Sequence, residues 1–511
     1  MSQSTIKSFD PVSGKHLDNA FQINTLDDLE SKIESAQWAY LVYRNTSGEE
    51  RATFLETIAD EIESDLTEIV ATATLETGLP AARIQGETGR TVGQLRLFAS
   101  ITREGSWVEG SIDTALPNRQ PLPRVDIRKY LIPIGPVGIF GAANYPLAFS
   151  TAGGDTASAL AAGNPVVVKA NNSHLGTHDL ICKAIARAIE NCNLPEGVFG
   201  AIVDSGFELG RALVQHPGIK AVGFTGSYSG GRALFDLVSQ RKDPIPFYGE
   251  MGSINPIVLF DSAIANASTS KQLINAIILG VGQFCTNPGL LLAIDSEAIA
   301  AFCNQLAIEA TAALGGVMLH QGIYESYQKA TTALGKGVEM SVLGEGTKGE
   351  GAFGVSSYIL KTTGEAFLSN SQLSQEVFGP YSLLVICKDE EELATLMMEL
   401  EGQLTISFMG TEAELEAADH LIAIAQEKAG RVIFNGVPTG VEVCHAMVHG
   451  GPFPATTQPN STSVGAEAIK RFSRPVCFQN APQSILPLAL QDENPLNIFR
   501  KINGTLTKQR L

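Results

Sequence analysis

Apolar positions recur at two different spacings along this chain of 511 residues. Over residues 26–75 they return every three or four positions among many charged residues, which predicts long helices in an outer layer. From about residue 130 onward, short apolar runs alternate with helical patterns. This alternation indicates parallel βαβ units, which bind ligands at the carboxyl ends of their strands. Strands are expected at 130–140, 165–169 and 219–224, and helices at about 179–192 and from about 230.

A second α/β region is expected from residue 250 to about residue 430. The Gly-, Pro- and Thr-rich stretch 431–465 is predicted to form loops that return to the first region. Residues 112–135, with four prolines among alternating apolar residues, are typical of a hairpin, and the tail from about 470 ends in polar residues. Neither of these two segments fits the α/β regions, so a surface hairpin with a frayed tail is one interpretation of them.

The composition argues against some classes of function. At 511 residues the chain exceeds one hydrophobic core, so two or three domains are expected. Its net charge of −18 argues against nucleic acid as a partner, since such proteins neutralise phosphates with Lys and Arg. The first residues lack the apolar core of a signal peptide, and no stretch approaches the roughly 18 apolar residues of a membrane span. We therefore expect a soluble, cytoplasmic protein without a membrane partner.

Seven cysteines are spread along the chain, and they show neither CxxC spacing nor a Cys/His cluster of the kind that binds zinc. Their odd number and their spacing favour reduced thiols in a cytoplasmic compartment. No bound metal ion is expected from this pattern.

Three short motifs carry candidate chemistry. Cys285 lies in Gly-Gln-Phe-Cys-Thr, Glu250 in Tyr-Gly-Glu-Met-Gly, and Asn144 in Gly-Ala-Ala-Asn-Tyr-Pro-Leu. Taken singly, each has a plainer interpretation: an inert buried cysteine, an exposed loop glutamate, and a turn-former or helix cap. In one chain, a thiol nucleophile, a carboxylate base and an amide donor indicate oxidation of a carbonyl group through a thioester.

In these contexts the three motifs closely resemble those of the NAD(P)-dependent aldehyde dehydrogenase superfamily, and the resemblance spans essentially the whole chain. It implies that Cys285 is the nucleophile that attacks the aldehyde carbon. The Asn144 amide and the backbone N–H of Cys285 would stabilise the resulting oxyanion. Glu250 would act as the general base that activates water to hydrolyse the thioester.

The usual G-x-G-x-x-G pattern for a dinucleotide is absent, and a different turn takes its place. The run Gly-Phe-Thr-Gly-Ser at 223–227 is expected where a strand meets a helix, whose N-terminal N–H groups and dipole attract a diphosphate. By resemblance, Lys169 contacts the adenosine ribose, while Glu376 and Phe378 contact the nicotinamide ribose and ring. Without the resemblance these would be a surface Lys, a surface Glu and a core Phe. The implied cofactor-binding residues are Lys169, Asn172, Gly223, Thr225, Gly226, Ser227, Gly231, Glu376 and Phe378.

Two positions depart from many members of the superfamily. Asn172 replaces a Glu that repels the 2′-phosphate, so NADP is expected to be used at least as well as NAD, with Lys169 and either His174 or Arg211 attracting the phosphate. His449, in a His-Gly-Gly-Pro-Phe-Pro loop, would assist as base or polarise the thiol, or else be a packed histidine. Both departures resemble the branch that contains α-ketoglutarate semialdehyde dehydrogenases and an NADP-dependent fatty aldehyde dehydrogenase.

The resemblance also implies a domain organisation and a fold class. The predicted fold is α/β, with a Rossmann-type cofactor domain, an α/β catalytic domain and a small bridging sheet that joins subunits in a homodimer or homotetramer. The cofactor domain is expected at 1–111, 136–249 and 431–469, the catalytic domain at 250–430, and the bridging segment at 112–135 and 470–511.

The substrate is predicted from the same branch and from a few residues. Asn144, Ala148 and Ala152 recur every four positions, so one helix face with two small side chains would line a roomy tunnel. α-Ketoglutarate semialdehyde, oxidised to 2-oxoglutarate, is the favoured small-molecule aldehyde, and a long-chain aliphatic aldehyde is the alternative. An arginine at the tunnel mouth would hold a substrate carboxylate; the candidates are Arg96, Arg119 and Arg124.

Two other functions remain as alternatives. Relatives that act on acyl phosphates or with coenzyme A use a cysteine but need no Glu to activate water, so Glu250 argues against that chemistry. A catalytically silent homologue with a binding role is the alternative from a different class. The complete set of Cys285, Glu250 and Asn144 argues against silence.

Overall fold

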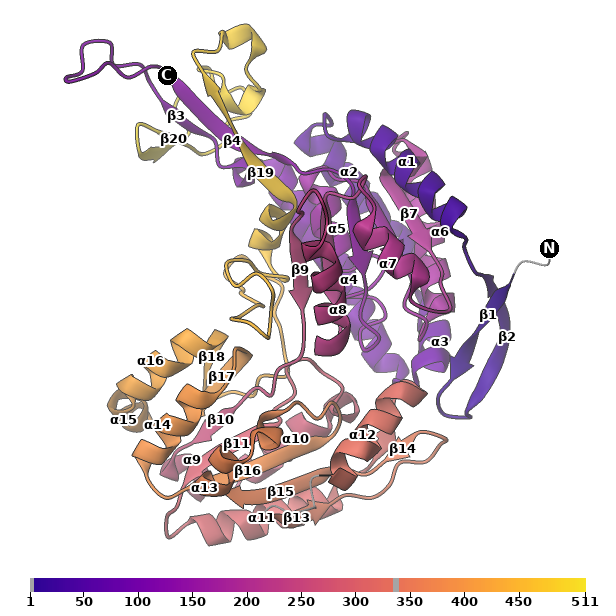
Figure 1. Cartoon of the computed structure of the whole chain (residues 1–511), viewed down its shortest axis with the longest axis vertical. Coiled ribbons are helices and arrows are strands. Elements are labelled where there is room, and N and C mark those ends of the chain that lie inside the picture. Colours follow the sequence, from indigo (N-terminus) through magenta and orange to yellow (C-terminus); the bar gives the residue numbers. More distant parts are fainter. Residues whose placement is uncertain (1–3, 334–339) are drawn as a thin grey trace.

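Two α/β lobes and a projecting arm make up the chain, shown in the computed structural model of Figure 1, which describes residues 4–333 and 340–511. The first lobe surrounds a parallel sheet with the strand order β7-β6-β5-β8-β9, the order of a Rossmann-type sheet. The second lobe surrounds a larger sheet with the order β13-β15-β16-β11-β10-β17-β18, and the arm contains a sheet with the order β19-β4-β3-β20-β21. The predicted α/β fold class is confirmed.

The first lobe packs helices on both faces of its sheet. Its strands are β5 (Val137–Phe140), β6 (Val166–Lys169), β7 (Phe199–Ile202), β8 (Ala221–Thr225) and β9 (Phe247–Glu250). Its helices are α1 (Leu26–Tyr43), α2 (Gly48–Ser64), α3 (Leu66–Thr77), α4 (Ala81–Glu104), α5 (Gly154–Ala162), α6 (Leu175–Asn191), α7 (Glu208–Gln215) and α8 (Tyr228–Ser239). The helical periodicity over 26–75 and the predicted strands at 165–169 and 219–224 are thereby confirmed.

Local sequence signals start and end the outer helices. Thr25 begins α1 and Ser47 begins α2, and each completes a capping box with a carboxylate three residues later, Asp28 and Glu50 respectively. Gly78 ends α3 in a left-handed conformation with φ of 68°, which glycine adopts without steric cost. The apolar faces of α2, α4, α5 and α6 then pack into one buried cluster with β5 and β6.

The second lobe also has helices on both faces of its sheet. Its strands are β10 (Ile257–Leu259), β11 (Leu290–Ile294), β13 (Ser341–Glu345), β15 (Tyr358–Thr363), β16 (Tyr381–Cys387), β17 (Gln403–Met409) and β18 (Ala429–Phe434). Its helices are α9 (Asp261–Ala265), α10 (Thr269–Ile278), α11 (Ile299–Ala312), α12 (Gln321–Ala333), α13 (Gly364–Ser369), α14 (Glu390–Glu399), α15 (Glu412–Ala417) and α16 (Asp419–Lys428). Outside the two lobe sheets and the arm, the described residues contain two short strand pairs: β1 (Thr5–Asp10) with β2 (Lys15–Gln22), and β12 (Gly316–Val317) with β14 (Gly354–Val355).

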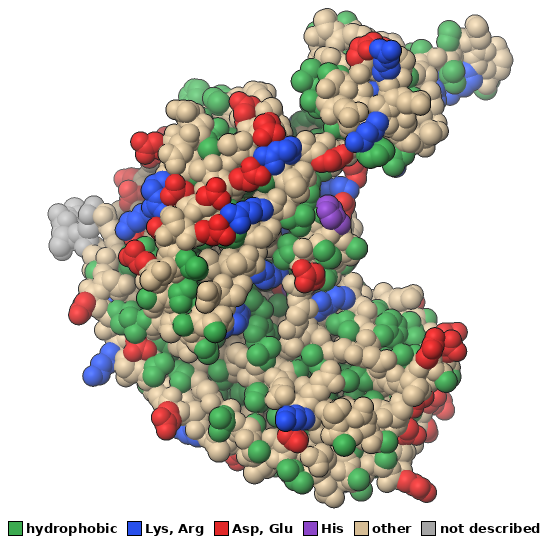
Figure 2. All heavy atoms as spheres, turned by 180° about the vertical axis from the view of Figure 1, so that it is seen from behind, with side chains coloured by type: hydrophobic (Ala, Val, Ile, Leu, Met, Phe, Trp, Pro, Cys, Tyr) green, Lys and Arg blue, Asp and Glu red, His purple; other side chains and the backbone are tan. Residues whose placement is uncertain are grey.

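The arm joins segments that are far apart in the sequence, and it stands clear of both lobes (Figures 1 and 2). It contains β3 (Ser111–Asp113), β4 (Ile127–Pro133), β19 (Ser473–Gln479), β20 (Arg500–Ile502) and β21 (Thr505–Thr507). Antiparallel pairing of β19 with β4 sets Val476 opposite Tyr130. The start of the tail is therefore an ordered strand, which rules out the interpretation as a frayed tail for this part.

Two predicted elements were wrong in extent. The expected strand 130–140 is two strands in different sheets, because Gly135 has φ of 126° and Pro136 has no N–H to continue a ladder. Residues 431–434, expected to be loop, continue β18 as an edge strand of the second sheet. Within the described ranges, none of the helices combines the length and the apolar run that a bilayer crossing requires.

Candidate active site

The carboxyl ends of the parallel strands bring the predicted residues to one edge of the first sheet. The register sets Phe140 of β5 beside Lys169 of β6, and Thr225 of β8 beside Glu250 of β9. β5 also pairs with β8, and Asn144 follows β5 by four residues. The chain runs from β5 outward to β7 and then returns to the other side of β5, so this edge includes the point where the strand order reverses, the usual place for a ligand in such sheets.

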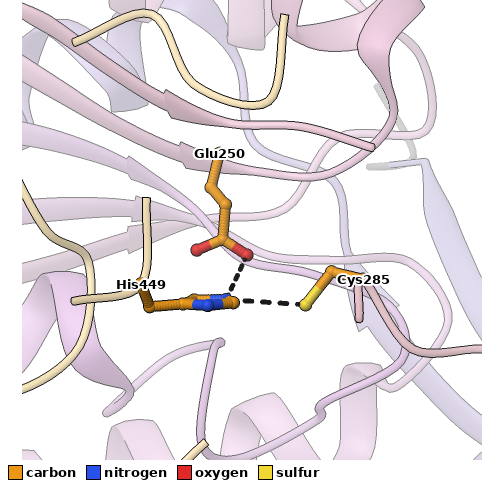
Figure 3. A group of neighbouring side chains, drawn as sticks. All are labelled: Glu250, Cys285 and His449. Atoms are coloured by element: carbon orange, nitrogen blue, oxygen red, sulfur yellow. Dashed lines mark hydrogen bonds and ion pairs between the residues drawn. The ribbon is translucent and has the colours of Figure 1, made fainter. Parts of the chain in front are cut away.

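Cys285, His449 and Glu250 come together at this edge, and one corner of the imidazole ring faces both the sulfur and the carboxylate (Figure 3). Cys285 is partly exposed, whereas the other two residues are buried. The His449 Nε2 atom lies 2.9 Å from Glu250 Oε1 and 3.6 Å from Cys285 Sγ. The side chains of His449 and Glu250 are only 1% and 3% exposed. His449 is therefore in direct contact with both predicted catalytic groups, and it is at the same time a packed, hydrogen-bonded histidine.

Glu250 is fixed from three directions. Its carbonyl accepts from Gly226 N–H of the turn after β8, at 3.1 Å, and the next residue pairs with the Ala455 carbonyl at 2.9 Å. The Ser463 hydroxyl donates to Glu250 Oε2 at 2.5 Å, and the other carboxylate oxygen, Oε1, contacts His449. The carboxylate is thus held by side chains of the 449–463 segment, which is more than 190 residues away in sequence.

The loop before the nucleophile takes a left-handed turn. Gly280, Val281 and Gly282 have φ of 56°, 60° and 64°. Valine in this conformation costs about 1–2 kcal/mol, and such strain concentrates at functional sites. A side chain at position 282 would lie 2.2 Å from the Gly379 carbonyl, so the Glu-x-Phe-Gly-Pro element packs directly against this turn. The turn therefore couples the position of Cys285 to that element.

Asn255 holds the nucleophile loop in place, a role that the sequence reasoning missed. Its Nδ2 atom donates to the carbonyls of Cys285 and Asn287, both at 2.9 Å, and its Oδ1 atom accepts from the Thr405 hydroxyl at 3.0 Å. The signal in the sequence was its place in the same run as Glu250, five residues further on. Because Asn255 is fully buried, these bonds fix the loop to the second lobe.

The pKa values of the Cys285 thiol and the Glu250 carboxyl group are shifted in opposite directions. Burial raises the pKa of the Cys285 thiol well above its usual range, and the neighbouring Glu250 and Glu376 charges raise it further, against a lowering by Arg90. Burial also raises the pKa of Glu250, but the His449 ring and the hydrogen bonds to the carboxylate outweigh it, so this pKa lies below its ordinary value. At neutral pH the carboxylate is charged and the thiol holds its proton.

One nitrogen of His449 serves both partners, and it carries at most one proton. A ring protonated on Nδ1 leaves Nε2 free to take the thiol proton. The resulting Nε2–H then donates to the Glu250 carboxylate. This arrangement can carry a proton away from the sulfur and stabilise the thiolate with the imidazolium that forms.

Asn144 lies beside the nucleophile, but not on a helix. Its Nδ2 atom donates to the Gln283 carbonyl at 2.8 Å, two residues before Cys285. Turns and bends occupy the segment up to Gly153, and α5 begins only at Gly154, so the predicted helix face with Ala148 and Ala152 is wrong. The reason is a tertiary contact: Glu87 of α4 accepts from two backbone N–H groups of this segment and holds it in a tight turn.

The predicted cofactor residues line the edge next to this cluster. Ser227 caps the N-terminus of α8 by accepting from Gly230 N–H, directly after β8. Burial lowers the pKa of Lys169, whose Nζ atom reaches the Asn172 side chain only at 3.4 Å. A side chain at position 231 would lie 2.7 Å from the Met251 sulfur, so glycine permits the close packing of α8 on the strand-end loop.

Glu376 is an exposed residue whose carboxyl group has few partners in the described part of the chain. The protein that surrounds the carboxyl group raises its pKa to about 7, against a single lowering contact, the N–H of Ser253 at 3.3 Å. A side chain at position 252 would lie 2.0 Å from its Oε2 atom, so Gly252 makes room for it. A carboxyl group kept in this state suits hydroxyl groups as partners, and the ribose of a dinucleotide supplies them.

The arginines and the histidine expected at a ligand lie elsewhere. Arg96 binds Asp60 and Glu63 on the helical surface, where acidic and basic side chains alternate (Figure 2). Arg119 and Arg124 bind backbone carbonyls of the arm, and His174 is fully buried with its Nε2 atom 3.1 Å from the Ala142 carbonyl. These predictions were wrong because sequence proximity to a motif does not fix the direction of a side chain. Ser463, described above, is another residue of the site that the sequence motifs did not indicate.

Cys285, His449 and Glu250, which we call the reaction cluster, also have the donor set of a metal site. Glu250, Cys285 and His449 each offer one ligand atom, and these atoms lie within 4.8 Å of one another. Thiolate, imidazole and carboxylate are the ligands that zinc prefers. An ion bound here would occupy the same atoms that the proton transfer uses.

Comparisons with known proteins agree with this geometry. The family model described as the aldehyde dehydrogenase family matches residues 1–452. α-Ketoglutaric semialdehyde dehydrogenase 2 of Azospirillum brasilense is 47% identical over 98% of this chain and 96% of its own length. α-Ketoglutaric semialdehyde dehydrogenase of Acinetobacter baylyi is 45% identical over 99% and 96%. A crystal structure of betaine aldehyde dehydrogenase from Staphylococcus aureus has the same fold, with a TM-score of 0.79 at 19% identity and 94% coverage of both chains. The chain therefore belongs to the aldehyde dehydrogenase family, which oxidises aldehydes with NAD(P)+.

Proposed function

We propose that the chain oxidises α-ketoglutarate semialdehyde to 2-oxoglutarate through a thioester on Cys285, consuming one water and one NADP+ per aldehyde. The observation that carries the chemistry is the contact of one His449 nitrogen with both Glu250 and Cys285, because it joins nucleophile and base. The substrate is supported by the names of the two relatives that match over nearly the full length.

Attack on the aldehyde begins with loss of the thiol proton, since burial keeps Cys285 protonated. His449 Nε2 accepts that proton, and Glu250 stabilises the imidazolium. The sulfur then bonds to the aldehyde carbon, and the carbonyl electrons move to oxygen. Asn144, whose amide lies beside this loop, donates to the oxyanion.

The predicted cofactor-binding residues beside the reaction cluster, which we call the cofactor edge, fit a nicotinamide dinucleotide. The α8 N-terminus at Ser227 would hold the diphosphate, Lys169 the adenosine ribose, and Glu376 the nicotinamide ribose, with Gly223, Thr225, Gly226, Gly231 and Phe378 shaping the pocket. When bound, the nicotinamide supplies the acceptor for the hydride of the adduct. NADP+ is preferred or used equally, because neutral Asn172 does not repel a 2′-phosphate. A tenfold higher kcat/KM with NAD+, about 1.4 kcal/mol, would contradict this preference.

Hydrolysis of the thioester completes the turnover. Glu250, ionised at neutral pH, takes a proton from water as the water oxygen bonds to the thioester carbon. The carbon–sulfur bond breaks, and the proton returns to the sulfur of Cys285. The carboxylic acid leaves, and His449 releases to solvent the proton that it took from the thiol, so the cluster regains its starting protonation.

A long-chain aliphatic aldehyde is the second candidate substrate, and one observation favours it. Apolar side chains gather on the 142–149 turn and on the 441–447 loop, which is packed against it; they include Ala148, Phe149, Val441, Val443 and Met447. The comparison of kcat/KM for α-ketoglutarate semialdehyde with that for decanal decides between the two. A clear advantage of decanal would contradict the oxo-acid proposal.

We further propose that the arm joins subunits in a cytoplasmic homodimer or homotetramer, with 112–135 and 470–511 as bridging segments. The arm projects from the lobes and exposes large apolar side chains, among them Leu122, Ile485 and Leu506, at 69%, 64% and 62%. The remaining division, with 1–111, 136–249 and 431–469 binding the cofactor and 250–430 carrying the nucleophile, is part of the same proposal. Sedimentation of the purified chain as a monomer at micromolar concentration would contradict the assembly.

A further inference from the structure

One face of α4 lies along the segment that follows β5, next to the reaction cluster. Arg83, Glu87, Arg90 and Gln94 are spaced four, three and four residues apart, so they share that face. The Arg83 guanidinium lies over the Tyr145 ring at 4.7 Å, and the Arg90 guanidinium over the Phe149 ring at 4.9 Å. Two cations thus approach one short turn from the same helix.

The two arginines differ in what already neutralises them. Arg83 forms an ion pair with Glu87, which also accepts from the backbone of the turn and has no carboxylate oxygen left over. Within the part of the chain that the structure describes, Arg90 has no ion pair, and its Nη1 atom is buried without a hydrogen-bond partner. Its single hydrogen bond runs from Nη2 to the Val441 carbonyl at 3.4 Å. Leaving buried guanidinium N–H groups unpaired is costly, so a ligand is the natural partner.

A third arginine near the cluster shows what a structural role looks like. Arg431 of β18 donates to the Gly440 and Pro438 carbonyls at 2.6 and 2.8 Å, and these two bonds hold the 438–441 loop even though its Nε atom is buried without a partner. The long contact of Arg90 to the same loop adds little to these bonds. Holding the loop is therefore a weak explanation for Arg90.

Arg90 is also close to the reacting atoms. Arg90 lies over the Phe149 ring, whose centroid is 6.1 Å from the centroid of the His449 ring. The His449 ring in turn contacts Cys285. The charges of Cys285 and Glu250 reach Arg90 as well: burial lowers its pKa, and both groups raise it in turn. The guanidinium thus stands one aromatic ring away from the cluster.

We propose that Arg90 binds the carboxylate of an oxo-acid aldehyde and so sets the specificity of this enzyme. The inference rests on the proposed function. In α-ketoglutarate semialdehyde, four carbon–carbon bonds separate the aldehyde carbon from the carboxylate carbon, a short reach that matches a cation beside the cluster. The planar guanidinium pairs with a carboxylate through two N–H groups, and the ring beneath it limits its rotation.

The test compares two variants from the same helix face. Arg90→Met is expected to lower kcat/KM for α-ketoglutarate semialdehyde about a hundredfold, while kcat/KM for pentanal, which has the same carbon number and no charge, changes less than about threefold. Arg83→Met is the matched control and keeps the wild-type ratio of the two substrates. Arg90→Lys, which retains the charge but not the paired N–H groups, is expected to recover part of the loss, mainly in KM.

An unchanged ratio in Arg90→Met, or an equal loss for both aldehydes, overturns the inference. If wild type itself prefers decanal to the semialdehyde, the proposed function fails first, whatever the variants show. If Arg90→Met does not fold, as judged by thermal unfolding, wild type is assayed with the carboxylate methyl ester of the semialdehyde. A tenfold or larger drop supports recognition of the charge by the enzyme, and equal kcat/KM values overturn it.

Discussion

The reaction cluster and the cofactor edge lie side by side, yet they treat charge in opposite ways. In the cluster, each oxygen of the buried Glu250 carboxylate contacts a side chain, His449 at one oxygen and Ser463 at the other. At the cofactor edge, Lys169 is half-buried and Glu376 is exposed, and among the described residues each makes one long hydrogen bond, at 3.4 and 3.3 Å. One region is complete without a ligand, and the other is not.

This difference predicts which substitutions alter the chemical steps and which alter cofactor binding. A satisfied carboxylate keeps its charge in a dry site and can accept a proton at any stage of the reaction. Charged groups with few protein partners keep donors and acceptors open to a ligand, which favours oriented binding. Changes in the first region should therefore alter the chemical steps, and changes in the second should alter cofactor selection.

Removal of the nucleophile should have the largest effect, because it should abolish the chemistry of the reaction cluster and leave cofactor binding in place. Cys285→Ala should lower dehydrogenase turnover by at least about a thousandfold and abolish ester hydrolysis, because both reactions need the same sulfur. Cofactor binding, measured by fluorescence titration, should stay within a few-fold of wild type, since the cofactor edge is untouched. Cys303→Ala, a buried cysteine of the second lobe, is the control and should remain active. Ester hydrolysis that survives in Cys285→Ala would remove the sulfur from the mechanism.

Loss of the base should separate two chemical steps. Glu250→Gln keeps the shape of the side chain but cannot accept a proton, so steady-state turnover should fall about a hundredfold or more. Hydride transfer in the first turnover, followed by rapid mixing, should be retained better than steady turnover. A missing burst would not decide the matter, because Glu250 also supports thiol activation through His449. Unimpaired steady turnover would disprove the role of Glu250 in hydrolysis.

Replacement of His449 should raise the pKa of Glu250. In His449→Gln, burial still raises the pKa of Glu250 without an imidazole to counter it, so this pKa should rise. A base acts only when deprotonated and is lost as pH falls through its pKa. The acidic limb of the kcat–pH profile should therefore move to higher pH, and kcat at neutral pH should fall about ten- to a hundredfold. Exposed His445 in the same loop is the control: His445→Gln should leave the profile in place.

A charge added at the cofactor edge should change selection rather than chemistry. Asn172→Glu places an anion three residues after Lys169, where it accepts from a ribose hydroxyl and repels a 2′-phosphate. The kcat/KM ratio of NADP+ to NAD+ should fall about tenfold or more. Asn172→Gln has nearly the same size without the charge and should keep the wild-type ratio. An equal shift in both variants would mean that shape, not charge, selects the cofactor.

The smallest expected effect concerns the pH dependence of cofactor binding. Glu376, with a pKa of about 7, is largely protonated below that pH and becomes the better hydroxyl acceptor above it. The Kd of NAD+, which lacks a 2′-phosphate that would titrate in the same range, should tighten a few-fold from about pH 6 to pH 8. In Glu376→Gln the profile should be flat over this range. Binding that weakens with rising pH in wild type would contradict this role.

Local patterns in the sequence predicted much of the fold. Apolar spacing gave the outer helices and the parallel strands, because period and capping act over a few residues. The split of 130–140 between two sheets was not predicted, since both halves have the same apolar character. The breaking residues, Gly135 and Pro136, became informative only once the two sheets were in place.

The candidate site was predictable where a motif carries its own chemistry. Cys285, Glu250 and Asn144 stand in short runs that resemble a family, and the structure brings all three together. The arginine that we propose for the substrate carboxylate was not predictable in this way. Arg96 and Arg90 lie on one helix, but only the turn that packs against α4 gives Arg90 a neighbour at the reaction cluster.

The sequence by itself determined the chemistry available to this protein: a thiol, a carboxylate, an amide and a neutral residue where others carry a cofactor-repelling charge. Only the tertiary structure decided how these groups share protons. His449 reaches Glu250 across 199 residues of sequence and Cys285 across 164. Such contacts depend on the packing of the 449–463 segment against β9, and long-range packing leaves no periodic signal in the chain. Residue types fix which reactions are possible, whereas burial and distance fix which of these groups is charged at neutral pH.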